Sequence, residues 1–184
     1  FDLGADFGSS SRLQGILLMG NAADLPEDPT DQSYALGLSA LNLLGQETLH
    51  RFGVFVNYRD AQGELRSDLR GRARSHWSFL FSSGGSDLEG NTWLESPPGT
   101  FTSGAYGGRF NQLDQYLMGL RLPVQVDEEF FLIQEATPIS PEQISAMNGP
   151  LDGASVTGIN APITVDMIID AHGPRIPSAY EAPK

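Results

Sequence analysis

The longest regular pattern of apolar positions in the chain lies between Asp31 and Gly53. Residues there recur at spacings of three and four on two neighbouring stripes, and both stripes are largely apolar. The first stripe contains Tyr34, Leu38, Leu41, Gly45, Leu49 and Phe52. The second contains Leu36, Ala40 and Leu43, followed by the polar residues Glu47 and His50. Such spacing is typical of an α-helix, and Asp31 or Thr30 can cap its first turn. Because both stripes are largely apolar, we expect this helix to be buried on nearly all sides.

The rest of the chain alternates short apolar runs with turn residues. Short runs bounded by Gly, Pro or Asn predict strands, at residues 13–19, 76–81, 92–95, 100–103, 130–133 and 155–159. Helical spacing predicts helices at residues 111–120, 141–147 and 165–171, and a capping residue precedes the last two. Three stretches read as loops, at residues 22–30, 59–74 and 82–91. The mixture predicts an α+β fold.

Length and composition favour a single folded domain. The 184 residues are 40% hydrophobic, which supplies a sizeable core, and no linker divides residues 1–184. The absence of cysteine excludes disulfides and thiolate metal sites. No run approaches the ~20 apolar residues that a membrane span needs.

The net charge of the chain restricts the classes of binding partner. The formal net charge of −12 disfavours binding to nucleic acid and to anionic membranes, and it suits a soluble extracytoplasmic protein. Six of the 11 basic residues lie within residues 51–74, which we interpret as a solvated region that pairs with the acidic remainder. The chain starts at Phe1 without Met or a signal-peptide pattern, so we expect a processed product or a fragment.

Candidate chemistry lies on the first helix, where Gln46, Glu47 and His50 form the pattern Q-E-x-x-H. It differs by one residue from H-E-x-x-H, in which two His one helical turn apart bind Zn²⁺ and the Glu takes a proton from the zinc-bound water. Gln46 stands where the first His would be, and an amide oxygen is a poor zinc ligand beside imidazole. Zinc binding then needs a replacement ligand.

The chain has three His, so few imidazoles could replace the zinc ligand that is missing at Gln46. His76 is the natural candidate, although a His beside Trp77 is often a hydrogen-bonded structural residue. His172 precedes Gly173-Pro174 and suits a helix C-terminus, where the dipole favours it. A single Q-E-x-x-H match in an apolar helix also arises by chance, and this alternative stays open.

Several segments extend the comparison beyond this motif. In order they are L-G-Q-E-T-L-H-R-F-G, H-W-S-F-L-F, D-L-E-G-N-T-W, R-F-N-Q-L-D-Q-Y-L-M-G-L, F-F-L-I and I-T-V-D-M-I-I-D-A-H-G-P-R-I-P. Over about residues 30–177 the chain resembles a family of secreted bacterial zinc metallopeptidases. The resemblance implies a zincin-like fold with a buried active-site helix, a small mixed sheet and a second helix. It also implies secretion, a peptide or protein substrate, and final elements beyond G-P-R-x-P that this chain lacks.

The resemblance assigns roles to individual residues. Glu47 matches the catalytic base and His50 the second zinc ligand, whereas Gln46 departs from the first ligand. A metzincin-like extension would place its third ligand at Val56, which cannot bind metal.

We therefore assign the third ligand to Asp114 on the predicted second helix, because related zincins use an acid there. Tyr116 on the same helix would donate to an oxyanion. The alternative for Asp114 is a surface ion pair with Arg109 or Arg121.

A second metal is considered at the turn S-G-G-S-D-L-E-G-N. Asp87, Glu89 and Asn91 present oxygen atoms at alternate positions, which suits Ca²⁺. The segment lacks a full EF-hand loop, and a plain glycine-rich turn is the alternative.

Two functions remain open from the sequence. One is a metallopeptidase with an altered zinc site, which hydrolyses peptides if the metal is retained. The other is a catalytically inactive extracellular module with a structural or interaction role, which would assemble into a homo-oligomer. An engineered change at Gln46 in an active enzyme would produce the same sequence.

Overall fold

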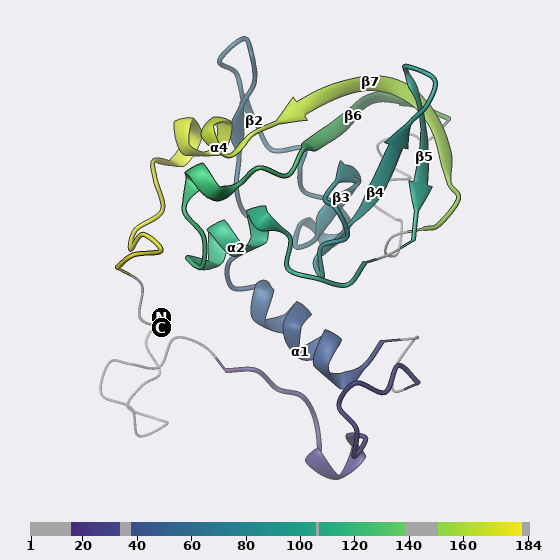
Figure 1. The fold of residues 1–184 in the computed structure, drawn as a ribbon, viewed down its shortest axis with the longest axis vertical. Helices are drawn as coiled ribbons and strands as arrows, with labels where there is room; N and C mark the ends of the chain where they lie inside the picture. The colour runs from purple at the N-terminus through teal and green to yellow at the C-terminus, as the bar shows by residue number, and fades with distance from the viewer. Residues whose placement is uncertain (1–15, 34–37, 106, 139–150, 182–184) are drawn as a thin grey trace. The chain divides into compact units, whose positions relative to one another are not determined.

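The computed structural model describes residues 16–33, 38–105, 107–138 and 151–181. The chain has an α+β fold, as predicted, with helices and sheets in one chain (Figure 1). It divides into two compact units, residues 1–51 and residues 52–184, and each is described by itself. The single domain expected from composition stays a prediction.

The first unit contains the 3₁₀ turn η2 (Ala22–Asp24) and the helix α1 (Ala40–Leu49). Ser39 caps α1, because its hydroxyl oxygen accepts from the backbone N–H of Asn42 at 3.1 Å, and the Asn42 side chain bonds back to Ser39. This capping box starts the helix later than the predicted cap at Asp31 or Thr30. Residues 34–37 of the predicted helix lie outside the described residues.

Two expectations about burial in this unit are wrong. The buried residues of α1 are Ala40 and Leu49, whereas Leu41 and Leu44 are 54% and 40% exposed, so α1 is not buried on nearly all sides. Residues 16–19 of the predicted strand at 13–19 form no regular structure, and Leu18 there is 91% exposed. An apolar run alone does not fix a strand without a pairing partner.

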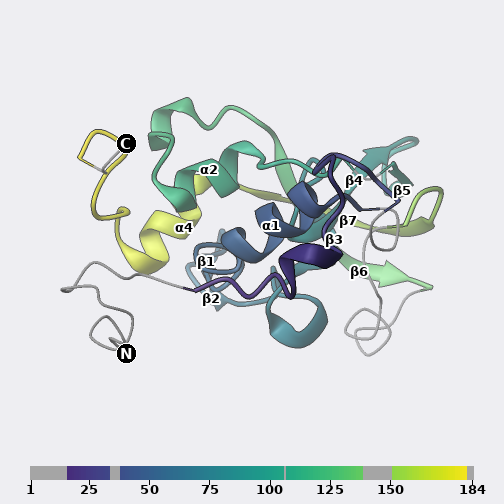
Figure 2. The same ribbon diagram turned by 90° about the horizontal axis from the view of Figure 1, so that it is seen from below.

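The second unit is built on five strands that close into a barrel (Figures 1 and 2). They are β3 (Trp77–Ser82), β4 (Glu89–Glu95), β5 (Thr100–Gly104), β6 (Phe130–Thr137) and β7 (Ser155–Ile163), in the order β3-β4-β5-β7-β6. β3 and β4 are parallel and the other pairs are antiparallel, so the predicted mixed sheet is confirmed. A closed five-stranded barrel is not, however, the architecture of a zincin fold.

Large side chains on these strands form the barrel core. Phe79 and Trp93 pack edge to face with ring centroids 5.6 Å apart, and Phe81 and Phe101 are fully buried. The strands predicted at residues 92–95 and 100–103 are confirmed, and they form a hairpin, because β4 and β5 pair in antiparallel register from Thr92↔Gly104 to Glu95↔Phe101. Such cross-strand aromatic packing is a main source of sheet stability.

Helices α2 (Gln112–Met118) and α4 (Val165–His172) lie in this unit, and both were predicted, α4 with Thr164 as its cap. Asn111 caps α2 and Thr164 caps α4. The helix predicted over 141–147 lies outside the described residues. The remaining pieces are short, namely the 3₁₀ turns η3 (Arg72–Arg74) and η4 (Pro123–Gln125).

The loop predicted over 59–74 contains a small hairpin. Strands β1 (Tyr58–Arg59) and β2 (Leu65–Arg66) pair in antiparallel register. α4 packs against β1, and the His172 Nε2 atom accepts from the backbone N–H of Asn57 at 2.7 Å. His172 thus has a structural contact at the C-terminal end of α4.

Candidate functional site

The motif on α1 has the helical geometry that its chemistry requires. The backbone N–H of His50 donates to the carbonyl oxygen of Gln46 at 3.1 Å, and His50 keeps right-handed helical dihedrals as the C-cap. Residues 46 and 50 are therefore one turn apart on the same face. Glu47 is exposed on this helix.

His76 lies in the second unit, just before β3, and is buried. Its Nε2 atom is 3.0 Å from Arg72 Nη2 and 3.5 Å from Glu89 Oε1. Arg72 also forms an ion pair with Glu89, in which Arg72 Nε is 3.1 Å from Glu89 Oε1. The three side chains therefore form one charged cluster, which we call the Arg72–His76–Glu89 cluster.

Asp114, the predicted third zinc ligand, is fully buried in the first turn of α2. Its Oδ1 atom accepts from the indole N–H of Trp77 at 3.1 Å, and its Oδ2 atom accepts from the backbone N–H of Asn111 at 3.1 Å. The alternative of a surface ion pair with Arg109 or Arg121 is wrong. Both carboxylate oxygens have N–H partners within the second unit.

Burial dominates the electrostatics of Asp114. Loss of water raises the pKa of its carboxyl group to about 7, although hydrogen bonds from Ser86, Trp77 and Asn111 act in the opposite direction. The neighbouring charge of Asp87 raises the pKa further. A carboxyl group that titrates near neutral pH is a common feature of functional sites, but structural networks produce it as well.

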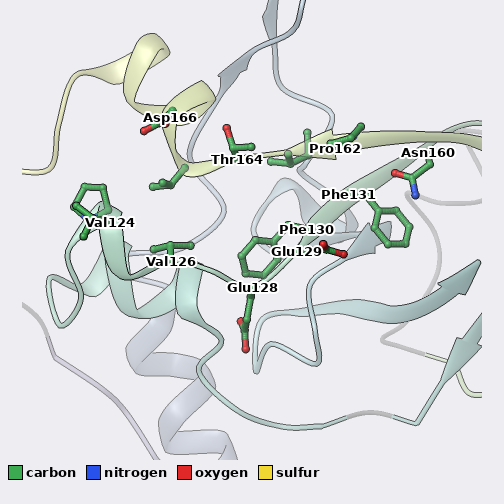
Figure 3. Close-up of a pocket in the computed structure, with 13 residues that line it drawn as sticks. Val124, Val126, Glu128, Glu129, Phe130, Phe131, Asn160, Pro162, Thr164 and Asp166 are labelled. Atoms are coloured by element: carbon green, nitrogen blue, oxygen red, sulfur yellow. The ribbon is translucent and has the colours of Figure 1, made fainter.

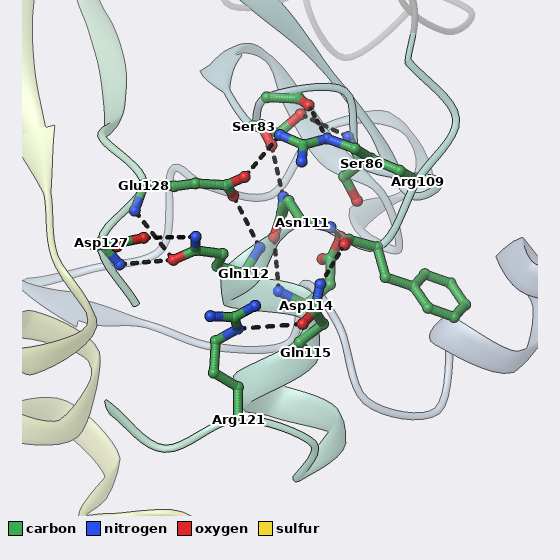
Figure 4. A network of polar contacts seen from close by, with 12 residues as sticks. Ser83, Ser86, Arg109, Asn111, Gln112, Asp114, Gln115, Arg121, Asp127 and Glu128 are labelled. Carbon is green, nitrogen blue, oxygen red and sulfur yellow. Dashed lines mark hydrogen bonds and ion pairs between the residues drawn. The ribbon is translucent and has the colours of Figure 1, made fainter. Parts of the chain in front are cut away.

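Polar side chains around the start of α2 form a continuous network, drawn in Figure 4. The Asn111 Oδ1 atom accepts from the backbone N–H of Asp114 at 2.7 Å, and its Nδ2 atom donates to the carbonyl of Ser83 at 2.6 Å. Glu128 joins the same network, because it accepts from Arg109 Nη2 at 2.7 Å and from the backbone N–H of Gln112 at 2.9 Å. The network ties α2 to the loop after β3 and to the segment before β6.

Tyr116, the predicted oxyanion donor, is buried on α2. Its hydroxyl oxygen accepts from the backbone N–H of Arg175 at 3.1 Å. The Arg175 guanidinium in turn donates to the carbonyls of Leu117 and Met118 at 2.8 and 3.1 Å. A cation that satisfies the last carbonyls of a helix stabilises it, so Tyr116 and Arg175 together anchor the C-terminal end of α2.

The residues considered for Ca²⁺ have protein partners of their own. The Asn91 Nδ2 atom donates to the carbonyl of Phe79 at 2.7 Å, and its Oδ1 atom accepts from the backbone N–H of Leu151 at 3.1 Å. Glu89 is paired with Arg72. Residues 89–91 also belong to strand β4 rather than to a turn. Asn91 and Glu89 are therefore satisfied by protein partners, and the Ca²⁺ site stays a prediction.

A shallow groove of about 740 Å³ lies between η4, the start of β6 and the end of β7 (Figure 3). Val124, Val126 and Phe131 give it apolar walls, and Val124 is 88% exposed. The exposed acidic residues Glu129 and Asp166 also line it. This arrangement suits an apolar side chain that is flanked by a positive charge. Pattern analysis of the sequence missed the groove, because its residues lie on separate elements.

The basic segment forms ion pairs, although the acid that Arg66 contacts lies within residues 51–74 and not in the rest of the chain. Arg66 Nη2 is 2.7 Å from Asp68 Oδ2, and Arg72 pairs with Glu89. The interpretation as a solvated region holds for Arg66, whereas Arg72 reaches a buried acid. Arg72 is the residue that sequence reasoning missed at the candidate site, and its position four residues before His76 was the available signal.

The structure therefore brings together only part of the predicted site. Asp114 and Tyr116 share α2, and His76 lies with Arg72 and Glu89. Gln46, Glu47 and His50 belong to the other unit, so their meeting with His76 or Asp114 at one metal ion stays a prediction. Among the residues that the structure describes, no three His, Asp or Glu side chains are grouped as metal ligands, and no helix is long and apolar enough to cross a membrane.

Comparisons with known proteins found no relatives. No family model matches the chain, no curated protein matches it, and no solved structure matches it.

Proposed function

We propose that the chain is a secreted, metallopeptidase-like module that has an interaction role and does not hydrolyse peptide bonds. The observation that carries this proposal is the state of Asp114. Both of its carboxylate oxygens accept hydrogen bonds from N–H groups of Trp77 and Asn111, so this buried carboxyl group is satisfied by protein partners without a metal. His76, the other replacement ligand, faces Arg72 and Glu89.

The amide at Gln46 supports the same proposal. Catalytic zinc sites use three protein ligands and keep the fourth position for water. With a neutral amide at the first position, His50 is left as the one strong ligand that the motif supplies. We therefore expect the motif to bind zinc weakly.

We assign the interaction role to the groove beside η4. Its apolar walls would hold an apolar side chain, and the carboxylates of Glu129 and Asp166 would attract a neighbouring Lys or Arg. The partner class that fits is a protein segment in which basic and apolar residues alternate. Replacement of Asp166 by Lys should weaken such binding, whereas replacement by Lys of the exposed Glu64, which does not line the groove, should not.

The decisive experiment compares wild type with Gln46→His. We expect wild type, purified in the presence of Zn²⁺, to hold well under one equivalent of zinc and to show no peptide hydrolysis. Gln46→His should gain zinc, measured by atomic emission, because it restores two imidazoles one turn apart. Gln62→His, which adds an exposed His in the β1–β2 turn, is the matched control. If Gln46→His binds no more zinc than Gln62→His, the inherited zinc site is refuted.

A second candidate function is an active zinc peptidase with an altered site. The helical spacing of Gln46 and His50 and the exposure of Glu47 favour it. It requires one equivalent of zinc in wild type and hydrolysis that Glu47→Ala abolishes. Assembly into a homo-oligomer is tested separately by light scattering, and a monomer at high concentration would count against a structural coat.

A further inference from the structure

A second groove, of about 450 Å³, lies where β3 and β6 diverge. The two strands pair near Phe81 and Leu132, whereas the start of β3 pairs with the segment before it, at the bridge Arg70↔Trp77. The walls of the groove come from β3, from β6 and from residues 66–70. We call it the β3–β6 groove, and all of its walls belong to the second unit.

Three buried polar atoms beside this groove have no hydrogen-bond partner among the residues that the structure describes. They are Oδ1 of Asp68, Nε of Arg70 and the hydroxyl of Tyr58. Asp68 and Arg70 line the groove, and the Tyr58 hydroxyl lies close to Asp68 and Gln134 without good hydrogen-bond geometry to either. Buried polar groups are nearly always paired, so three such atoms at one place indicate that another molecule bonds to them.

The charged residues around the groove balance one another. Two are basic and two are acidic, namely Arg66, Arg70, Asp68 and Glu135. A ligand ammonium would face two guanidinium groups, and a ligand carboxylate would face two acids. A hydroxyl group both donates and accepts, so one hydroxyl can bond to Oδ1 of Asp68 and to Nε of Arg70. The groove therefore fits a neutral ligand that carries hydroxyl groups.

The rim of the groove can open to such a ligand. Arg66 Nη2 lies 2.7 Å from Asp68 Oδ2, and the two side chains are 43% and 36% exposed. An ion pair this exposed contributes little to stability, so Arg66 can turn away from Asp68 at low cost. On the opposite wall, Glu135 has φ of +53° where the register of β6 shifts against β7. Such irregularities re-aim a side chain and are common beside binding sites.

We propose that the β3–β6 groove binds a neutral polyhydroxylated ligand of the sugar class. One ligand hydroxyl donates to Oδ1 of Asp68 and accepts from Nε of Arg70, and Gln134 and Glu135 bond to further hydroxyls. The groove shares no residue with the groove beside η4 or with the motif on α1. The inference therefore goes beyond the proposed function, and either one can fail without the other.

NMR titrations of the ¹⁵N-labelled full chain test the proposal, with the methyl glycosides of glucose, galactose and mannose as probes. At least one glycoside should bind with saturation and shift the backbone amide resonances of Gln134 and Glu135. Asp68→Ala should weaken this binding about tenfold or more, because it removes a hydrogen bond to a charged acceptor. Asp166→Ala, which removes an exposed acid outside this groove, should bind the glycoside as wild type does.

A charged probe and a second variant make the test decisive. L-Leucine, a zwitterion of similar size, should bind more weakly than the glycoside. If Asp68→Ala does not fold, Arg70→Lys, which keeps the positive charge and removes Nε, is used in the same titrations. The proposal is overturned if no glycoside shifts the resonances of Gln134 and Glu135, if the folded variant binds as tightly as wild type, or if L-leucine binds more tightly.

Discussion

The indole N–H of Trp77 donates to Oδ1 of Asp114 across 37 positions of sequence, at a distance of 3.1 Å. Trp77 is the first residue of β3, and Asp114 lies in the first turn of α2. This contact therefore fixes the start of α2 against the barrel. It also places a carboxyl group in an environment without water, and burial raises its pKa to about 7.

The first prediction is a pH dependence of stability that comes from Asp114. The pKa is 3.8 in the unfolded chain and about 7 in the folded one, so the folded state binds one more proton between these values. The stabilisation is fully present below pH 3.8 and is lost as the pH rises through about 7. At about 1.4 kcal/mol per pKa unit, it amounts to a few kcal/mol.

Urea unfolding at pH 5 and pH 8 measures this effect as a difference between variants. Asp114→Asn cannot titrate, so its loss of stability relative to wild type should be larger at pH 5 than at pH 8. Asp166→Asn, an exposed acid in the first turn of α4, should change both values alike. Equal losses for Asp114→Asn at the two pH values would contradict the prediction.

Local signals in the sequence predicted elements well where a cap or a turn determines them. Asn111 and Thr164 start α2 and α4, and Pro97-Pro98-Gly99 joins β4 to β5, because each acts within a few residues of itself. The closure of the barrel was not predictable in this way. It depends on pairing of β5 with β7 and of β3 with β6, which lie far apart in the chain.

In the candidate site, too, local features were predictable from the sequence and long-range contacts were not. The one-turn spacing of Gln46 and His50 follows from helical periodicity and was predictable. The partners of Asp114 and His76 were not, because Trp77 and Glu89 reach them through the tertiary fold. Position in a helix therefore could not decide whether Asp114 is a ligand, a surface acid or a buried structural acid.

The second prediction separates a structural from a catalytic role of Tyr116. Tyr116→Phe leaves the backbone N–H of Arg175 without its acceptor, which should lower the free energy of unfolding by about 1 kcal/mol. Arg175→Ala keeps the backbone N–H that bonds to Tyr116 but removes the guanidinium bonds to the carbonyls of Leu117 and Met118, and it should cost about 2–3 kcal/mol.

A double-mutant cycle provides the control. Both contacts hold the same end of α2, so the double variant should lose less stability than the sum of the two single losses. Additive losses would show that Tyr116 and Arg175 act separately. In any preparation with peptidase activity, loss of that activity in Tyr116→Phe without loss of stability would favour the oxyanion role instead.

The third prediction concerns Asn111, whose side-chain amide accepts one hydrogen bond through Oδ1 and donates another through Nδ2. Asn111→Ala removes the cap of α2 and leaves the carbonyl of Ser83 without its donor, so it should cost about 2–4 kcal/mol in urea unfolding. Thr164→Ala removes only the exposed cap of α4 and should cost about 1 kcal/mol. Similar losses for the two variants would show that the bond to Ser83 contributes little.

The last prediction concerns Gly90, next to the strained Glu89. Gly90 has φ of +73°, and a Cβ atom there would lie 2.6 Å from Ser83 Oγ, 2.8 Å from Ser83 Cβ and 3.0 Å from the carbonyl oxygen of Phe81. The Ser83 hydroxyl cannot move away freely, because it donates to the carbonyl of Glu89 at 2.9 Å. Gly90→Ala should therefore cost about 3 kcal/mol or more, from the steric overlap added to the left-handed backbone.

Gly63→Ala, with φ of +79° and nothing within 4 Å, should cost only the backbone part of about 1–2 kcal/mol. If urea unfolding gives equal losses for the two variants, the close approach of Gly90 to Ser83 does not constrain β4, and the backbone strain alone explains why glycine occupies this position.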